Sequence, residues 1–165
     1  IAQFLAARGY LVLSYAYRPS APDYAGLAAH ALTDLRAAVS FMRTRLVVTR
    51  LILVGASLGA LVSLKAAASM RCDGLIAISS PLGYQDVQLD DGELGRLAMP
   101  KLFVTSADNQ PFASDTLQMF DASPEPKEKR VYPGNAHGTS LFGGASGADL
   151  LFAMLTFVQQ YAPAQ

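Results

Sequence analysis

The stretch that decides the fold is Leu51-Ile52-Leu53-Val54-Gly55-Ala56-Ser57-Leu58-Gly59-Ala60. Its first half is an uncharged apolar run, which is typical of a strand buried on both faces of a sheet. It ends in Gly-x-Ser-x-Gly, and a helical pattern follows at once, so the sequence predicts a strand, a sharp turn and a helix. A serine at the tip of such a turn projects from the sheet edge. We therefore predict that Ser57 is a nucleophile.

The residues around this serine fit the same interpretation. The strand and the helix diverge so closely that side chains at Gly55 and Gly59 are expected to collide, which explains the two glycines. The amide of Leu58 opens the helix and has no acceptor within it, so it can face a developing oxyanion. The alternative is a glycine-containing turn with an incidental serine.

The composition indicates a single α/β domain over residues 1–165. Of the 165 residues, 52% are hydrophobic and 16% are charged, which suits a buried parallel sheet covered by helices. Lys plus Arg equals Asp plus Glu, so there is no electrostatic basis for binding nucleic acid or an anionic membrane. The longest uncharged apolar run, Leu51 to Leu64, is shorter than the roughly 20 residues that span a bilayer.

The cysteine content bears on the cellular compartment, and the first residues bear on whether further strands precede Ile1. Cys72 is the only cysteine, which excludes an internal disulfide and a cysteine metal cluster and favours a reducing compartment such as the cytoplasm. We expect no metal and no organic cofactor. The segment Ile1 to Arg8 has the pattern of the second half of a helix, so we expect further strands before it. An export signal there stays open.

Strands and helices are predicted to alternate along the chain. The expected strands are Tyr10–Tyr15, Leu51–Val54, Gly74–Ser79, Lys101–Thr105 and Glu128–Tyr132, and the expected helices are Ala25–Arg45, Leu58–Met70, Phe112–Asp121 and Ala148–Tyr161. Right-handed crossovers then give a mainly parallel sheet with helices on both faces, a three-layer αβα fold. Its chemistry is expected at the carboxyl ends of the strands.

Two residues in loops after strands qualify as partners of the serine, which needs a base and an acceptor that orients the base. His137 lies in the loop directly after the last strand, whereas His30 lies inside the long helix and is expected to be a surface or partly buried helix residue. Asp108 follows the fourth strand directly, although an aspartate there also suits a turn. The runner-up acids, all in the connection after the third strand, are Asp86, Asp90 and Asp91.

The chain order Ser57, Asp108, His137 resembles that of the α/β-hydrolase superfamily. The resemblance covers nearly the whole chain. It implies Ser57 as nucleophile, His137 as general base and then acid, Asp108 as the orienting carboxylate and the Leu58 amide as an oxyanion donor.

The chain also departs from the family pattern. After the strand predicted at Tyr10–Tyr15, the segment Tyr15-Ala-Tyr-Arg-Pro19 replaces the Asp-x-Arg-Gly-x-Gly-type stretch that the family often has at this place. The family's first strands and its second oxyanion donor are expected before Ile1, so the domain is interpreted as truncated at its amino terminus. The missing middle strand is then expected to leave a slot beside the elbow strand. The connection Ser80–Met99 allows at most a short helix, so we expect an open site without a large cap.

The family implies hydrolysis of a small acyl substrate, an ester in the first place, with an amide or a thioester as alternatives. An acyltransferase with the same three residues and a non-catalytic binding domain of the same fold remain open as rivals. Leu82, Tyr84, Tyr15, Tyr17 and Phe142 lie near enough along the chain to line a pocket, although each also suits a packing role. The oligomeric state stays open.

Overall fold

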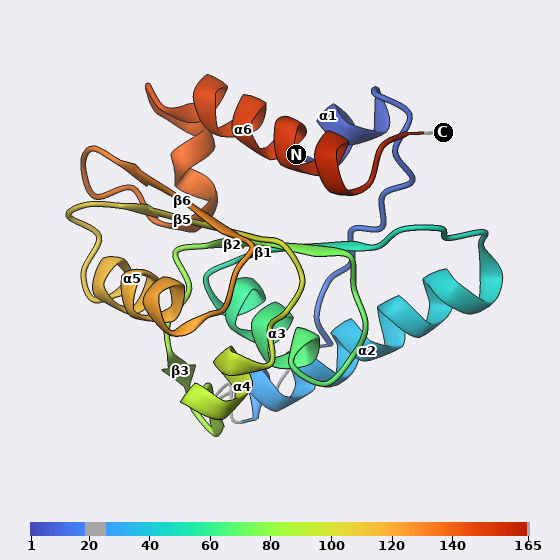
Figure 1. The fold of residues 1–165 in the computed structure, drawn as a ribbon, viewed down its shortest axis with the longest axis horizontal. Helices are drawn as coiled ribbons and strands as arrows, with labels where there is room; N and C mark the ends of the chain where they lie inside the picture. The colour runs from blue at the N-terminus through green and yellow to red at the C-terminus, as the bar shows by residue number, and fades with distance from the viewer. Residues whose placement is uncertain (19–25, 165) are drawn as a thin grey trace.

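The centre of the molecule is a four-stranded parallel sheet (Figure 1). The computed structural model describes residues 1–18 and 26–164. The sheet runs in the order β1 (Ile52–Ala56), β2 (Gly74–Ile78), β5 (Lys101–Ser106) and β6 (Lys127–Tyr132). All three strand pairs are parallel. The carboxyl ends of the strands therefore meet at one edge of the sheet, and the structure confirms the predicted parallel α/β architecture.

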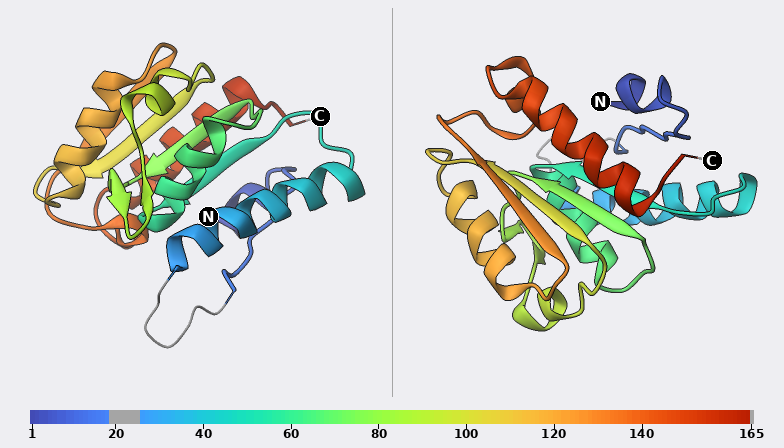
Figure 2. Two further views of the ribbon diagram at one scale, coloured as in Figure 1. Left: turned by 90° about the horizontal axis from the view of Figure 1, so that it is seen from below. Right: turned by 45° about the horizontal axis from the view of Figure 1, so that its top comes forward.

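Helices cover both faces of the sheet, giving three layers (Figure 2). One face carries α2 (Leu27–Arg45), α3 (Leu58–Ala67) and α5 (Phe112–Ala122). The other carries α6 (Gly147–Tyr161), preceded by the short 3₁₀ helix η1 (Gly138–Gly143), and the short α1 (Ala2–Ala6) lies on the same side. The first residue of the helix expected at Ala25 lies outside the described residues.

Two apolar clusters form the core, one on each face of the sheet. Because successive strand residues point to opposite faces, Leu75 and Ala77 join the cluster under α2 and α3, whereas Ile76 and Ile78 join the one under α6. Every residue of β2 and β5 is buried, as expected for central strands of a parallel sheet. These two strands therefore hold the carboxyl edge in a fixed frame.

The strand expected at Tyr10–Tyr15 is absent from the sheet, so that prediction is wrong. The segment has no regular structure, and its Leu11 and Leu13 are 58% and 39% exposed. A strand needs a neighbour to satisfy its backbone groups, and this segment pairs with no described strand. The segment does not pair with β1 in the described residues, and a cavity of about 670 Å³ is lined by residues of both.

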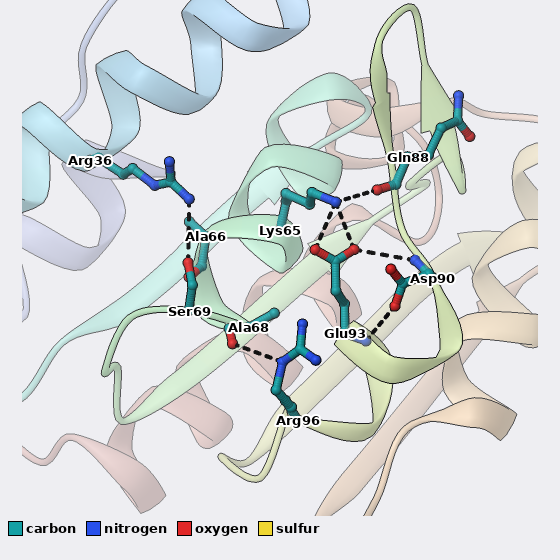
Figure 3. Close-up of polar contacts among 9 residues, drawn as sticks. All are labelled: Arg36, Lys65, Ala66, Ala68, Ser69, Gln88, Asp90, Glu93 and Arg96. Atoms are coloured by element: carbon teal, nitrogen blue, oxygen red, sulfur yellow. Dashed lines mark hydrogen bonds and ion pairs between the residues drawn. The ribbon is translucent and has the colours of Figure 1, made fainter.

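The connection between β2 and β5 is small. It contains the two-residue strands β3 (Gly83–Tyr84) and β4 (Val87–Gln88) and the five-residue helix α4 (Asp91–Gly95). Asp90 caps α4 by accepting a 2.7 Å hydrogen bond from the Glu93 amide, and Lys65 Nζ on α3 contacts the Glu93 carboxylate at 2.7 Å (Figure 3). The connection is therefore fastened to α3, and within the described residues it forms no large cap.

None of the helices in the described parts of the chain is long and apolar enough to span a membrane.

Candidate active site

Ser57 stands at the turn between β1 and α3. Its backbone has φ 53° and ψ −123°, in the region that non-glycine residues rarely adopt. The Ser57 amide donates to the Ile78 carbonyl oxygen at 2.8 Å, so the neighbouring strand helps hold this conformation. A Cβ atom at Gly55 would overlap the backbone carbonyl of Gly59, whereas one at Gly59 would meet only the tip of Tyr17, at 3.2 Å. The steric requirement for glycine is therefore strict at Gly55 and weaker at Gly59.

His137 contacts Ser57 across 80 positions of sequence. Its Nε2 lies 2.9 Å from Ser57 Oγ, within hydrogen-bond distance. The histidine follows β6, at the same edge of the sheet where β1 leads into Ser57. Parallel pairing of the strands thus brings the two side chains together.

Two buried serines anchor the loop that carries His137. Ser79 Oγ, at the end of β2, accepts a 3.0 Å hydrogen bond from the Gly138 amide. Ser106 Oγ, at the end of β5, donates to the Ala136 carbonyl oxygen at 2.8 Å. Both serines are 0% exposed, so solvent does not compete for these bonds. The residues on either side of His137 are therefore tied to the central strands.

Asn109 occupies the position that was expected for the acid. Its Nδ2 lies 3.0 Å from His137 Nδ1, on the side of the ring opposite Ser57. Asn109 is buried, with 7% of its surface exposed. The ring of Phe112 packs against the imidazole, with the two ring centroids 4.1 Å apart. The imidazole is thus held from three sides, by Ser57, Asn109 and Phe112.

Asp108 does not contact the imidazole, which corrects the expectation from the sequence. The residue is exposed, and no hydrogen bond of the described residues joins its carboxylate to His137. Its amide donates to the Gly134 carbonyl oxygen at 2.9 Å, and the Asn109 amide donates to that of Ser106 at 3.2 Å. This tight turn leaves the Asp108 side chain exposed and directs the Asn109 side chain inward.

The runner-up acids form no hydrogen bond with the His137 ring in the described residues. Asp90 is committed to capping α4, and Asp86 and Asp91 are exposed. His30 is exposed on α2, as expected for a surface residue of this helix.

The Leu58 amide is free to donate at the start of α3. No hydrogen bond of the described residues uses it, since the first bonds at this helix end come from the amides of Ala60 and Leu61, at 2.9 and 3.1 Å from the Ser57 carbonyl oxygen. Free amides at a helix start favour negative charge. The arrangement can therefore stabilise an oxyanion formed at Ser57.

The cavity beside β1 reaches the turn at Ser57. Its lining includes Gly55, Ala56, Gly59 and Thr139, and Tyr15 and Tyr17 contribute to its wall. Burial raises the pKa of the Tyr17 hydroxyl, and the Asp34 carboxylate adds to the rise. The phenol therefore stays protonated and can donate a hydrogen bond at the cavity.

The other expected pocket residues are used mainly for packing. Leu82 packs against the cluster under α2 and α3, and Phe142 packs against the cluster under α6. Tyr84 is 44% exposed. In the described residues, no group of three or more His, Cys, Asp or Glu side chains is arranged to hold a metal ion.

The sequence interpretation missed three residues of the site: Asn109, Ser79 and Ser106. Ser79 directly follows β2, Ser106 ends β5, and Asn109 lies in the loop that follows β5, so their places after buried strands are a detectable signal. A carboxylate is the usual orienting group of a histidine base, so the sequence pattern favoured Asp108 over the adjacent amide of Asn109.

Comparisons with known proteins support the fold. No protein-family model matches the chain, and no curated protein matches it in sequence. Among solved structures, the chain is similar to one that is described with the metagenome-derived lipolytic enzymes LipS and LipT. The match has a TM-score of 0.71 and 15% identity, and it covers 96% of this chain and 86% of the matched chain. Est1E from Butyrivibrio proteoclasticus matches with TM-score 0.68 and 16% identity, covering 81% and 70%.

A third match is an α/β serine hydrolase without a lid from Xanthomonas campestris, with TM-score 0.62 and 24% identity. The alignment covers 84% of this chain and 60% of that protein. With its parallel sheet and flanking helices, the chain has an α/β-hydrolase fold.

Proposed function

We propose that the protein is a serine hydrolase that cleaves a carboxylic ester through an acyl-enzyme. The observation that carries this proposal is the 2.9 Å contact between His137 Nε2 and Ser57 Oγ, with Ser57 held at φ 53° between a strand and a helix. The esterases and lipolytic enzymes among the structural matches support the same class of reaction.

The reaction follows from the two side chains. Ser57 Oγ attacks the ester carbonyl carbon while its proton passes to His137 Nε2. The tetrahedral intermediate carries its negative charge on the former carbonyl oxygen, where the Leu58 amide donates a hydrogen bond. The carbon–oxygen bond to the alcohol then breaks, and His137 returns the proton to the departing alcohol.

Water completes the cycle by the same route. It attacks the acyl-enzyme carbonyl carbon and gives a proton to His137 Nε2, and the acid is released as Ser57 Oγ recovers that proton. His137 thus acts as a base and an acid once in each half of the reaction.

The proposal is tested by labelling and turnover. The protein is expected to react with a fluorophosphonate probe and to hydrolyse short p-nitrophenyl esters, and Ser57→Ala is expected to lose both. His137→Ala is expected to lower kcat by a factor of about 100 or more, the contribution typical of a general base. His30→Ala is the matched control and is expected to keep wild-type turnover. Wild-type turnover by Ser57→Ala contradicts the proposal.

A further inference from the structure

The side chain that faces His137 Nδ1 is an amide rather than a carboxylate. We infer that Asn109 is the positioning residue for His137, and that its side-chain amide selects which ring nitrogen carries the proton. The inference rests on the proposed function, because the proton position matters only if His137 serves as a base for Ser57. It is supported by the 3.0 Å separation of Asn109 Nδ2 from His137 Nδ1 and by the 7% exposure of Asn109.

The orientation of the amide decides whether the histidine can accept a proton. When Nδ2 faces the ring it donates, so Nδ1 must accept and the ring proton sits on Nε2. In that tautomer the ring donates to Ser57 Oγ and cannot take its proton. A half-turn of the amide places Oδ1 at the same point, where it accepts from Nδ1–H and leaves the Nε2 lone pair facing Ser57. The second orientation is the working state.

Within the described residues, no second hydrogen bond of the Asn109 side chain opposes the half-turn. The bond to His137 is the only hydrogen bond that the Asn109 side chain makes among the described residues. The Asn109 backbone is fixed independently, by its amide donating to Ser106 at 3.2 Å and its carbonyl oxygen accepting from Ala113 at 2.8 Å. The side chain can therefore exchange its oxygen and nitrogen without disturbing the turn.

An amide has a further consequence for the rate. It carries no charge, so it orients the imidazole without stabilising the imidazolium that forms when Ser57 attacks. In a protease triad, replacing the aspartate by asparagine lowers kcat by about 10⁴ through the wrong tautomer. The site is consequently expected to gain activity when Asn109 becomes a carboxylate.

The experiment compares substitutions at two adjacent positions. Asn109→Leu preserves size and removes both polar atoms, and it is expected to lower kcat by about 10-fold or more with KM within about twofold of wild type. Asn109→Asp is expected to raise kcat by about 10-fold or more. Asp108→Asn is the control and is expected to keep kcat within about twofold. The inference is overturned if Asn109→Leu keeps wild-type kcat. It is also overturned if kcat falls as much in Asn109→Asp, or in Asp108→Asn, as it does in Asn109→Leu.

A spectroscopic measurement separates this inference from the proposed function. The chain has two histidines, so His30→Gln leaves His137 as the single imidazole in a ¹⁵N spectrum. We expect the ring proton to lie on Nδ1 when Asn109 is intact and to shift toward Nε2 in Asn109→Leu. This measurement does not depend on catalytic turnover. An Nε2–H tautomer in both proteins contradicts the inference. Absence of labelling and turnover with the expected spectra contradicts only the proposed function.

Discussion

At the scale of the residue, the turn at Ser57 depends on the absence of a Cβ atom at Gly55. Gly55 lies where the backbone of α3 passes back over β1, and any Cβ atom there would overlap the Gly59 carbonyl group. The overlap is with backbone, which cannot rotate away as a side chain can. The Ser57 conformation therefore requires glycine at position 55.

Gly55→Ala is expected to abolish hydrolysis and to destabilise the fold by about 1–3 kcal/mol, the usual cost of overpacking a well-packed site. Gly59→Ala is the matched control, because its Cβ would meet only Tyr17 Oη at 3.2 Å, and the tyrosine can move. Urea unfolding and ester turnover measure the two effects. Equal losses in both variants contradict this steric account.

At the scale of the element, the histidine loop is positioned by the ends of two buried strands. The bond from the Gly138 amide to Ser79 Oγ fixes one side of His137, and the bond from Ser106 Oγ to the Ala136 carbonyl oxygen fixes the other. Ser79 itself has φ 48° and is 0% exposed. The loop is held by these bonds at its base.

Ser79→Ala is expected to lower kcat by about 10-fold or more, because an unpaired buried amide at Gly138 costs about 1–3 kcal/mol and frees the loop to move. Ser80→Ala is the matched control, since Ser80 is equally buried but its hydroxyl donates only to the Pro81 carbonyl oxygen at 3.0 Å. Steady-state kinetics and melting curves of both variants provide the comparison. A Ser80→Ala protein that loses as much kcat as Ser79→Ala would show that the Gly138 bond has no special role.

At the scale of the whole molecule, the two edges of the described sheet differ in character. The β6 edge carries exposed Glu128, Lys129 and Arg130, and charges on an edge strand oppose pairing with other chains. The β1 edge is Ile-Leu-Val-Gly-Ala, and its Val54 is 37% exposed. The uncharged edge is therefore the site where self-association is expected.

Val54→Lys is expected to lower self-association of the 165-residue chain, because a lysine on an edge strand blocks edge-to-edge pairing. Val131→Lys on β6 is the control, since Val131 is 45% exposed beside existing charges and a further one changes little. Light scattering against concentration, with a melting curve of each variant, measures the effect. The account fails if scattering is unchanged in Val54→Lys or falls equally in Val131→Lys.

From β1 onward the sequence alone determined the alternation of strands and helices, because β1, β2 and β5 are short continuous runs that are largely apolar. The Gly-x-Ser-x-Gly turn likewise follows from its immediate neighbours, and the placement of His137 after the last strand follows from the order of elements. A parallel sheet gathers the carboxyl ends of its strands at one edge, so the sequence alone predicts that Ser57 and His137 lie close together.

The tertiary structure alone decided which residue faces the imidazole and which segments join the sheet. Asp108 and Asn109 are adjacent, and only the backbone bonds of the turn to Gly134 and Ser106 direct the amide inward and the carboxylate outward. The segment at Tyr10–Tyr15 has the composition of a strand but no strand to pair with, since pairing depends on a neighbour elsewhere in the chain. Both outcomes depend on contacts between distant residues, which local sequence preferences do not encode.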